Sequence, residues 1–573
     1  MGKLMNNSDV ARIFYKMASL SQFLDENPFK TRAYQKAARN IESLDVDIKQ
    51  LSKEGKLETI PGIGRAIAKK IMEILETGTC KRYEEMKSEV PVDIFQLLDI
   101  PGMGPKTIQL VYKHLGVTTL DELEKAAIEH RIRKLPRMGV KQEEKILRSI
   151  RRSKGKEKRT PLGMALPIAE SVMKYLKQCP DAENITPTGS LRRHKETVGD
   201  IDFIATSDHP ESVIRAFTTI PEVTEVIGSG TTKASVIFRD IQIDLRIVDR
   251  SSFGSLLQHF TGSKEHNIRL REIAIKKGFK LSEYGITDQK TGTLMPCEKE
   301  DEVYQRLDLP FIVPELREDR GEIEAAIAGK LPDLLTLDDI RGDLHVHSTW
   351  SDGADTIPEM VDAAIKRNYE YICISDHSRS RKIAGGLSEE DLIKQIEEID
   401  DINENLDGFR VLKGSEVDIL GDGTLDYDDH ILAMLDIVVA AVHSGFSQDR
   451  RTMTSRIVRA IENEFVDILA HPTGRLLGER IGYEVDIDRV IEVAAETDTV
   501  IEINAFPSRL DLNDINARKA KESGVMLAID TDAHSVDHLK FMDFGVQVAR
   551  RAWLESGDVL NTMSVKDVLK RVE

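Results

Sequence analysis

The sequence has little cysteine and no long hydrophobic run, and both absences narrow the kind of protein it encodes. Its four cysteines, at positions 80, 179, 297 and 373, lie too far apart to form Cys-x-x-Cys pairs or a disulfide framework. No run of about 18 apolar residues could span a membrane, and the first residues lack the apolar core of a signal peptide. We therefore expect a cytoplasmic protein without a membrane partner.

The charge of the chain is distributed unevenly. With 573 residues the chain is too long for a single core, since domains commonly contain ~100–200 residues. Residues 1–160 contain 32 lysines and arginines against 22 acidic residues, whereas residues 331–573 contain 26 against 49. Only the first segment has the sign that attracts a phosphate backbone. Phosphate chemistry in the last segment would need bound cations to offset its repulsion.

The basic N-terminal segment contains a repeated turn between helix-like stretches. Ile-Pro-Gly-Ile-Gly at 60–64 and Ile-Pro-Gly-Met-Gly at 100–104 each precede a helical pattern, and a weaker copy spans 135–139. Such a turn presents backbone N–H groups at the positive end of a helix dipole, where they bind phosphate without reading bases. The glycines could instead be mere connectors, but two copies in a basic segment favour DNA binding by Gly62, Gly64, Gly102 and Gly104. These elements resemble the helix-hairpin-helix motif of DNA repair proteins.

The middle segment carries three acidic candidates for metal binding. Asp200 and Asp202 lie two apart in an apolar run, so on a strand their carboxylates project from one face. Asp244 follows in a second strand-like segment, 241–247. Carboxylates on adjacent strands can hold two Mg²⁺ ions for nucleotidyl transfer. A lone Asp-x-Asp is more often surface decoration, but Gly189-Ser190 and an arginine pair precede this one and supply donors to a triphosphate.

The strings GSLRRHKETVGDID, QIDLR and HFTGSKEHNIRLREIAIKKGFKLSEYG resemble the palm and thumb of family X DNA polymerases, in order over residues 1–315. The resemblance implies Asp200, Asp202 and Asp244 as metal ligands, with Asp244 acting on the primer 3′-hydroxyl. It places the incoming nucleotide near Gly189, Ser190, Arg193, Gly199, Phe260, Gly262 and Asn267. His259 and Lys264 stand where polymerase beta has tyrosine and aspartate, which leaves ribonucleotide discrimination open.

The same family implies a second reaction for the N-terminal unit. In this family that unit can remove a 5′-deoxyribose phosphate through a lysine Schiff base. The resemblance places Lys70 at the nucleophile and Lys30 and Tyr34 at the 5′-phosphate pocket, whereas Ala66 replaces a family lysine of that pocket. Because an exposed helical lysine is usually a solvated charge, both interpretations of Lys70 stay open.

From residue 337 onwards short apolar strands alternate with helical stretches, which predicts a βα barrel. Polar residues cluster at the carboxyl ends of these strands, where barrels place their sites. They are His345, His347, Asp352, His377, Glu416, His443, His471, Asp532 and His534. A single strand-end histidine is more often structural, but nine such donors suit up to three Mn²⁺ or Zn²⁺ ions that generate a hydroxide nucleophile. The predicted reaction is phosphoester hydrolysis.

The strings HVHSTWSDG, SDHS, GSEVDI, VHS, AHP and DTDAHS resemble the polymerase and histidinol phosphatase (PHP) domain over residues 338–573. The resemblance assigns the nine donors to three ions. One ion is bound by His345, His347, Glu416 and Asp532, a second by Glu416, His443 and His471, and a third by Asp352, His377 and His534. Arg475 and Arg509 follow two of the strands and are candidates for binding substrate phosphates.

The expected protein is a multidomain gap-filling DNA polymerase with a 3′–5′ exonuclease, and abasic-site cleavage is a further option. We expect an all-α helix-hairpin-helix N-terminal region, an α+β nucleotidyltransferase palm and thumb, and a C-terminal (β/α)7-type PHP barrel. Their expected bounds are 1–90 (lyase-like), 91–160 (fingers-like), 161–255 (palm), 256–315 (thumb), 316–337 (linker) and 338–573 (PHP). Expected partners are gapped or nicked DNA and deoxynucleoside triphosphates, bound by a monomer. Two alternatives stay open: a polymerase fused to a small-molecule phosphoesterase, and a DNA-binding scaffold with a silent polymerase.

Overall fold

The computed structural model describes residues 7–42, 48–60, 62–91, 97, 103–136, 138–140, 142–143, 146–147 and 159–572. The chain divides into two compact units, Met1–Lys158 and Arg159–Glu573. None of the helices within these described ranges is long and apolar enough to cross a bilayer.

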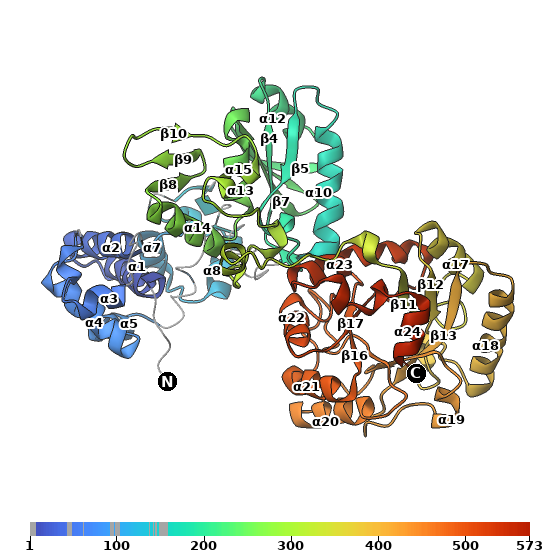
Figure 1. The fold of residues 1–573 in the computed structure, drawn as a ribbon. Coiled ribbons are helices and arrows are strands. Elements are labelled where there is room, and N and C mark those ends of the chain that lie inside the picture. Colours follow the sequence, from blue (N-terminus) through green and yellow to red (C-terminus); the bar gives the residue numbers. More distant parts are fainter. Residues whose placement is uncertain are drawn as a thin grey trace. The chain divides into compact units, whose positions relative to one another are not determined.

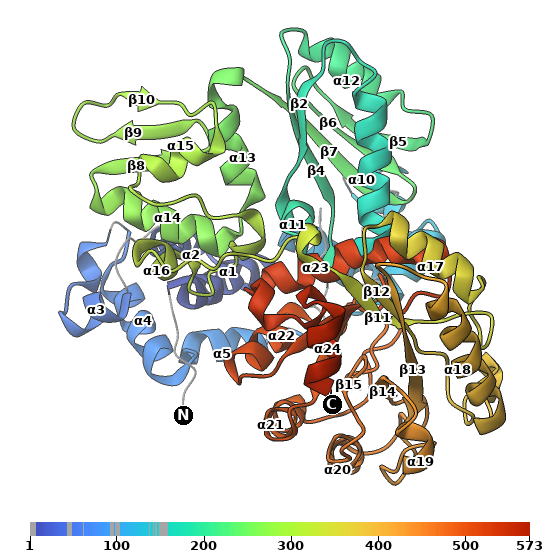
Figure 2. The ribbon, with the colours of Figure 1, turned by 45° about the vertical axis from the view of Figure 1, so that its right-hand side comes forward.

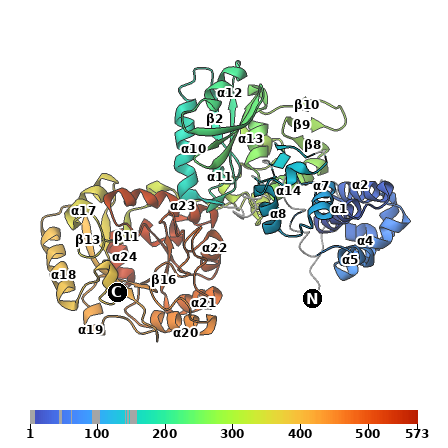
Figure 3. The ribbon, with the colours of Figure 1, turned by 180° about the vertical axis from the view of Figure 1, so that it is seen from behind.

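The described part of the first unit is helical, which confirms the expected all-α class (Figure 3). Helix α1 packs against α2, α4, α5 and α7 and buries Phe14 and Met17 completely. The helices are α1 (Asn7–Phe23), α2 (Pro28–Glu42), α3 (Ile48–Lys53), η1 (Leu57–Thr59), α4 (Arg65–Thr77), α5 (Lys81–Ser88), α7 (Pro105–Leu115), α8 (Leu120–Ile128) and η2 (Ile132–Lys134).

The second unit begins with a five-stranded mixed sheet, the palm. Its order is β2-β4-β7-β6-β5, in which β4 and β7 are parallel neighbours and the other pairs are antiparallel. Figure 2 shows helices α10 and α12 over this sheet, and α12 contacts β5, β6 and β7. The bounds are α10 (Leu162–Leu176), β2 (Glu183–Pro187), α11 (Gly189–Arg192), β4 (Ile201–Thr206), α12 (Pro210–Thr218), β5 (Val223–Ser229), β6 (Lys233–Phe238) and β7 (Ile241–Val248), with a small β1–β3 pair (Thr160–Pro161 and Thr197–Val198).

The thumb follows as three helices and a three-stranded antiparallel sheet of order β10-β9-β8. After η3 (Arg250–Ser252), its elements are α13 (Phe253–Thr261), α14 (Lys264–Lys276), β8 (Phe279–Ser282), β9 (Gly285–Asp288), β10 (Leu294–Met295) and α15 (Glu300–Gln305). Helices α13 and α15 pack so closely that a Cβ at Gly254 would lie 2.1 Å from the Lys299 carbonyl carbon. The thumb thus has its own core beside the palm.

The segment expected to be a linker is ordered and partly buried. It contains η4 (Pro314–Leu316), α16 (Glu322–Ile327) and η5 (Leu337–Asp339). Arg317 and Glu322 are completely buried, although residues of these types are rarely buried unless paired. Arg317 donates hydrogen bonds to Glu300 and to the Ile312 carbonyl, and Glu322 pairs with His266. Charged partners in the thumb therefore hold this segment in place.

The C-terminal part is a seven-stranded, all-parallel sheet with strands in sequence order, which confirms the expected PHP-type barrel (Figure 1). A bridge between Val346 and Ala533, and a 2.8 Å hydrogen bond from the His347 amide to the Ala533 carbonyl, join the first strand to the segment after the last. The strands are β11 (Gly342–Val346), β12 (Tyr371–Ile374), β13 (Arg410–Asp418), β14 (Ile437–Ala441), β15 (Ile468–Leu469), β16 (Val500–Asn504) and β17 (Leu527–Asp530).

These strands are buried on both faces because helices cover the outside and the barrel core fills the inside. Every residue of β11, β12, β14, β15, β16 and β17 is buried. The surrounding elements are α17 (Ile357–Lys366), η6 (Lys382–Ala384), α18 (Glu389–Glu404), α19 (Asp429–Leu432), α20 (Arg450–Ile461), α21 (Ile487–Thr497), α22 (Asp514–Glu522), η7 (Val536–Phe541), α23 (Met542–Arg551), η8 (Ser556–Asp558), η9 (Leu560–Thr562) and α24 (Val565–Val572). This arrangement leaves the carboxyl ends of the strands as the place for polar chemistry.

Asp467, before β15, gives a testable property of the barrel. Its carboxylate accepts a 2.7 Å hydrogen bond from the Val438 amide, yet burial raises its pKa to about 7. Because this pKa lies above the unfolded value, the folded state binds the proton more tightly and loses stability as pH rises from 4 to 7. We expect Asp467→Asn to stabilise the protein by about 1 kcal/mol at pH 8 and to change little at pH 4.

Thermal unfolding followed by circular dichroism at pH 4 and pH 8 measures this difference. Asp407→Asn, at an exposed position, controls for the loss of one negative charge. Equal shifts at the two pH values would contradict the interpretation.

Candidate functional site

The palm sheet brings the predicted acidic residues to one place. Asp202 on β4 pairs in parallel register with Asp244 on β7, and Asp200 immediately precedes β4. Burial, together with the charges of Asp200 and Asp244, raises the pKa of Asp202 to about 6. The residues therefore form a mutually repelling set, as a site for divalent cations requires.

Basic groups moderate this repulsion without neutralising it. Lys233 Nζ lies 3.6 Å from Asp244 Oδ2, and Gln242 donates a 3.1 Å hydrogen bond to Asp244 Oδ1. Asp202 and Asp244 line a small cavity of about 40 Å³ with Thr188, Arg246 and Phe260. The Arg246 guanidinium stacks over the Phe260 ring at 4.9 Å, so Phe260, predicted to lie near the incoming nucleotide, borders the carboxylates.

The turn before these carboxylates connects the palm to the thumb. Gly189, at φ +62°, begins α11, and its Cβ position lies 3.5 Å from Asp202 Oδ2. Arg193 donates a 2.5 Å hydrogen bond to the Thr261 carbonyl and lies beside Gly262. Ser190 lies on α11, and Gly199 directly precedes Asp200. Most of the predicted nucleotide-binding residues therefore gather around one corner of the palm.

Asn267 borders a separate hollow of the thumb. Its amide donates to the His259 carbonyl at 2.8 Å and accepts from Gln258 at 2.7 Å. These residues line a pocket of about 400 Å³ together with Arg271, Ile275, Lys280, Leu281, Ser282 and Glu283. Arg271 and Lys280, which the sequence did not single out, give this pocket a positive charge.

The N-terminal unit places its glycines at helix starts, as the repeat predicts. Gly64 and Gly104 are the N-caps of α4 and α7, and neither helix has a side-chain cap. Gly62 adopts φ +81°, whereas Gly102 lies outside the described residues. Open helix N-termini of this kind accept phosphate oxygens.

The proposed lyase residues are less clearly arranged. Lys70 lies on α4 and donates a 3.2 Å hydrogen bond to the Ala66 carbonyl within its own helix. Lys30 is exposed on α2, whereas Tyr34 is only 6% exposed and its ring packs against Phe14. Nothing in these contacts distinguishes a catalytic lysine from a solvated one, so the lyase stays a prediction.

All nine predicted donors of the barrel meet at the carboxyl ends of its strands, with Glu416 at the centre. Glu416 Oε1 lies 2.8 Å from His471 Nε2, 3.1 Å from His443 Nε2 and 3.6 Å from His345 Nε2. Its Oε2 lies 2.7 Å from His377 Nδ1 and 3.7 Å from His347 Nε2. One buried carboxylate is thus surrounded by five imidazoles.

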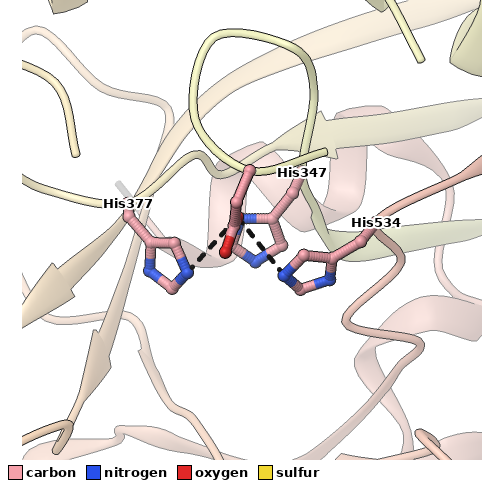
Figure 4. Close-up of side chains that lie close together, drawn as sticks. His347, His377 and His534 are labelled. Atoms are coloured by element: carbon pink, nitrogen blue, oxygen red, sulfur yellow. Dashed lines mark ion pairs between the residues drawn. The ribbon is translucent and has the colours of Figure 1, made fainter. Parts of the chain in front are cut away.

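Three groups of donors within the cluster are close enough to share an ion. They are His345, His347 and Asp532; His377, Glu416 and His443; and His347, Asp352, His377 and His534. Figure 4 shows His377 and His534 on either side of His347. Asp352 Oδ1 lies 3.6 Å from His377 Nε2 and 3.4 Å from His534 Nε2. These groups match the expected sets only in part. Glu416 is not in the group of His345, His377 takes the place of His471 beside Glu416 and His443, and His347 joins the third group.

The buried donors fit cations better than they fit one another. Three buried atoms, His345 Nε2 and both ring nitrogens of His347, lack a hydrogen-bonding partner among the described residues. His377 Nδ1 and Glu416 Oε2 are 2.7 Å apart but do not meet hydrogen-bond geometry. Burial would raise the pKa of Glu416, but His443, His377 and His345 hold it well below its usual value. Burial lowers the pKa of His347 to about 3, with help from His534 and His377, so this imidazole is neutral and free to act as a ligand.

Two carboxylates that the sequence reading missed orient these histidines. Glu502 Oε1 lies 2.7 Å from His345 Nδ1, and its Oε2 accepts a 2.6 Å hydrogen bond from the His471 amide. Asp418 Oδ1 lies 2.5 Å from His443 Nδ1. Such outer carboxylates fix the tautomer of a metal-binding histidine. Asp418 follows Glu416 by two residues on β13, so the strand period could have indicated it.

Only one of the two arginines predicted to bind phosphate lies against the cluster. Arg509 Nε is 3.3 Å from Asp532 Oδ2, whereas Arg475 pairs with Glu196 of the palm at 2.8 Å. Arg480 and Arg381 add positive charge near Arg509. The pKa of Arg480 is lowered mainly by burial and also by the charges of Arg509 and Arg381. An anion bound among these three arginines would relieve the repulsion between their charges.

The remaining histidines of the barrel lie outside the cluster. His538 Nδ1 accepts a 3.2 Å hydrogen bond from the His534 amide, so it helps to hold the backbone of the predicted ligand His534. His430 lines a separate surface pocket of about 530 Å³ with Tyr427, Asp428 and Arg459.

Comparison with family models divides the chain as the fold does. Residues 5–80 match a helix-hairpin-helix domain and residues 95–152 a SAM-like helix-hairpin-helix tandem. Residues 256–318 match the DNA polymerase beta thumb, and residues 343–505 match the PHP domain. Asp532 and His534 lie beyond the last match, and the fold alone brings them to the cluster.

Curated relatives cover the whole chain or one part of it. The DNA polymerase/3′-5′ exonuclease PolX of Bacillus subtilis is 43% identical over 98% of this chain and 99% of its own length. A probable phosphatase of Thermoanaerobacter sp. is 34% identical over 40% of this chain and 94% of its own length. DNA polymerase lambda of Rattus norvegicus is 26% identical over 49% of this chain and 52% of its own length.

The role of Glu502 can be measured without any assay of activity. Glu502→Gln keeps the shape of the side chain but weakens the polarisation of His345, and we expect metal affinity to fall 10- to 100-fold. Calorimetric titration of metal-stripped protein with Mn²⁺ measures this change. Glu464→Gln, on an exposed residue of the same barrel, is the matched control. Unchanged affinity in Glu502→Gln would show that this carboxylate does not support the ligands.

Proposed function

The chain belongs to the PolX family of DNA polymerase/3′–5′ exonucleases, and we propose on that premise that it fills short gaps in DNA and trims 3′ ends. The observation that carries the proposal is that two separate centres gather metal-binding donors, one on the adjacent strands β4 and β7 of the palm and one at the strand ends of the barrel. The chain depends on divalent metals for both reactions. Mg²⁺ in the palm and Mn²⁺ or Zn²⁺ in the barrel are the identities we propose.

In the polymerase reaction, Asp200, Asp202 and Asp244 would hold two Mg²⁺ ions, which supply charge neutralisation and a more acidic primer 3′-hydroxyl when bound. Arg193 and Ser190 would donate to the oxygens of the deoxynucleoside triphosphate. Asn267, already held by Gln258 and the His259 carbonyl, would contact the incoming nucleotide. Gly64 and Gly104 would fix the DNA backbone of a gapped or nicked duplex through helix N-termini.

In the nuclease reaction, the nine barrel donors would hold up to three ions, which supply a nucleophilic hydroxide and neutralise the phosphodiester when bound. Glu502 and Asp418 keep His345 and His443 in the orientation required of ligands. Arg509 would bind the non-bridging oxygens of the scissile phosphate. Both reactions use the same 3′ terminus, which one extends and the other shortens.

A second candidate for the barrel is hydrolysis of small phosphomonoesters. The similarity of this part to a probable phosphatase favours it, since that relative is matched over 94% of its length. Free phosphate released from a small phosphomonoester, without nucleotide release from a recessed 3′ end, would support this candidate over the exonuclease.

A gapped duplex with a 5′-labelled primer tests both proposed activities in one gel. With Mg²⁺ or Mn²⁺ and nucleotides we expect longer products, and without nucleotides shorter ones. Asp200→Ala should abolish only the longer products and His345→Ala only the shorter ones, because the two centres share no residue. Loss of a metal ligand should reduce its reaction by at least ~100-fold.

Two results would contradict the assignment. Primer extension that survives Asp200→Ala would place the polymerase elsewhere, and shortening that survives His345→Ala would remove the barrel from the nuclease reaction. Asp407→Ala, at an exposed position of the barrel, serves as the control for nonspecific effects.

The lyase is tested separately by trapping. If Lys70 forms a Schiff base, borohydride should link the protein covalently to a 5′-deoxyribose phosphate end, and Lys70→Ala should remove that adduct. Lys69→Ala, the neighbouring lysine on the same helix, is the control. Equal trapping in both variants would exclude Lys70 as the nucleophile.

A further inference from the structure

Within the second unit, a chain of charged side chains joins the palm to the barrel. Arg193 Nε donates a 2.9 Å hydrogen bond to Glu318 Oε1. From helix α23 of the barrel, Arg551 Nη1 donates to the same oxygen at 3.1 Å and to the Arg193 carbonyl at 2.6 Å. Its Nη2 donates to Asp514, at the start of α22, at 2.7 Å. We call these four residues the Glu318 junction.

The junction is buried, so its charges cannot be replaced by water. Arg551 is 4% exposed and Arg193 8%, and the Glu318 side chain is 9% exposed. Burial alone would raise the pKa of Glu318, but Arg193 and Arg551 hold it below its usual value. Removing one member of such a set leaves the remaining buried charges less well compensated, which is costly.

Arg193 is the member that faces the nucleotide site. Its Nε is taken by Glu318 and its Nη1 by the Thr261 carbonyl at the end of α13. Among the described residues none accepts a hydrogen bond from Nη2. Two nitrogens thus fix the plane of the guanidinium, and the third remains to donate to a phosphate oxygen.

We propose that Glu318 and Arg551 are positioning residues of the polymerase, so that the barrel helps to build the nucleotide site of the palm. This inference rests on the proposed function, in which Arg193 binds the triphosphate. Arg551 shares the charge of Glu318 and holds the backbone of Arg193 in place. Without Arg551, Glu318 would compete more strongly with the triphosphate for the same guanidinium.

The neighbouring residue of α23 provides a matched control. Arg550 Nε donates to Glu315 at 2.8 Å and its Nη1 to the Leu335 carbonyl at 2.9 Å. It therefore ties the barrel to the same segment of chain without contacting Glu318 or Arg193. Loss of Arg550 loosens the attachment of α23, whereas loss of Arg551 acts on the nucleotide site as well.

The test uses the full-length protein and steady-state extension of a primer across a one-nucleotide gap. We expect Arg551→Met to raise KM for the nucleotide about tenfold with a smaller change in kcat, because one charge contact of the triphosphate is weakened. Shortening of the same primer without nucleotides should be unchanged. Arg551→Lys, which restores a charge beside Glu318, should recover part of the lost affinity, and Arg550→Met should leave KM near the wild-type value.

A double variant separates positioning from packing. In a Glu318→Gln background the competing charge is gone, so Arg551→Met should add little to KM, and the two effects should be non-additive. An unchanged KM in folded Arg551→Met, or an equal rise in Arg550→Met, would overturn the inference. If Arg551→Met does not fold, Arg551→Lys and Glu318→Gln decide it by the same measurement, and an unchanged KM in both overturns it. Wild-type protein that fails to extend the primer would instead refute the proposed function.

Discussion

The barrel depends on a single buried carboxylate, Glu416, that lies within 4 Å of five imidazoles. Such a group is tolerable only when positive charge surrounds it. In the protein alone that charge must come from protons, and the neighbouring carboxylates, Glu416 first among them, raise the pKa of His377 to about 10 against the opposing effect of burial. Divalent cations would replace these protons, because metal ligands must be deprotonated. Metal binding and the stability of the strand ends therefore depend on the same buried charges.

The palm solves a related problem with fewer donors and more basic neighbours. Asp202 and Asp244 face each other in register on parallel strands, and Lys233 and Arg246 lower the pKa of Asp202 against the repulsion of its partners. The acidic C-terminal segment and the basic N-terminal one therefore do not conflict. Under the proposed function, backbone N–H groups and lysines would bind the DNA backbone, and the two acidic centres would act on its terminus through cations.

The parts of the site that the sequence predicted are those governed by a repeating geometry. Parallel strands end at one rim, so the sequence could place nine donors at strand ends together. The Asp-x-Asp spacing predicted two carboxylates on one strand face, but only Asp202 lies on β4, and Asp200 precedes it. No such repeating pattern in the sequence predicts the positions of Glu502 or of the Glu318 junction. Glu318 lies 125 residues from Arg193 and 233 from Arg551, and only the packing of palm against barrel brings them together. The segment 316–337 was expected to be a linker, whereas Arg317 and Glu322 in it are buried and paired.

That segment explains why the second unit is compact despite its mixed architecture. Arg317 binds Glu300 of the thumb, Glu318 binds Arg193 of the palm and Arg551 of the barrel, and Arg320 binds Asp514 of the barrel at 2.9 Å. Three residues within a stretch of four, 317–320, thus contact three different parts. Two apolar surfaces can shift relative to each other by the width of one side chain at a small cost in free energy. Buried ion pairs are satisfied in only one register. We infer that this alternation of charge fixes the register of the palm against the barrel. The buried charged groups of the two candidate metal centres need such fixed positions.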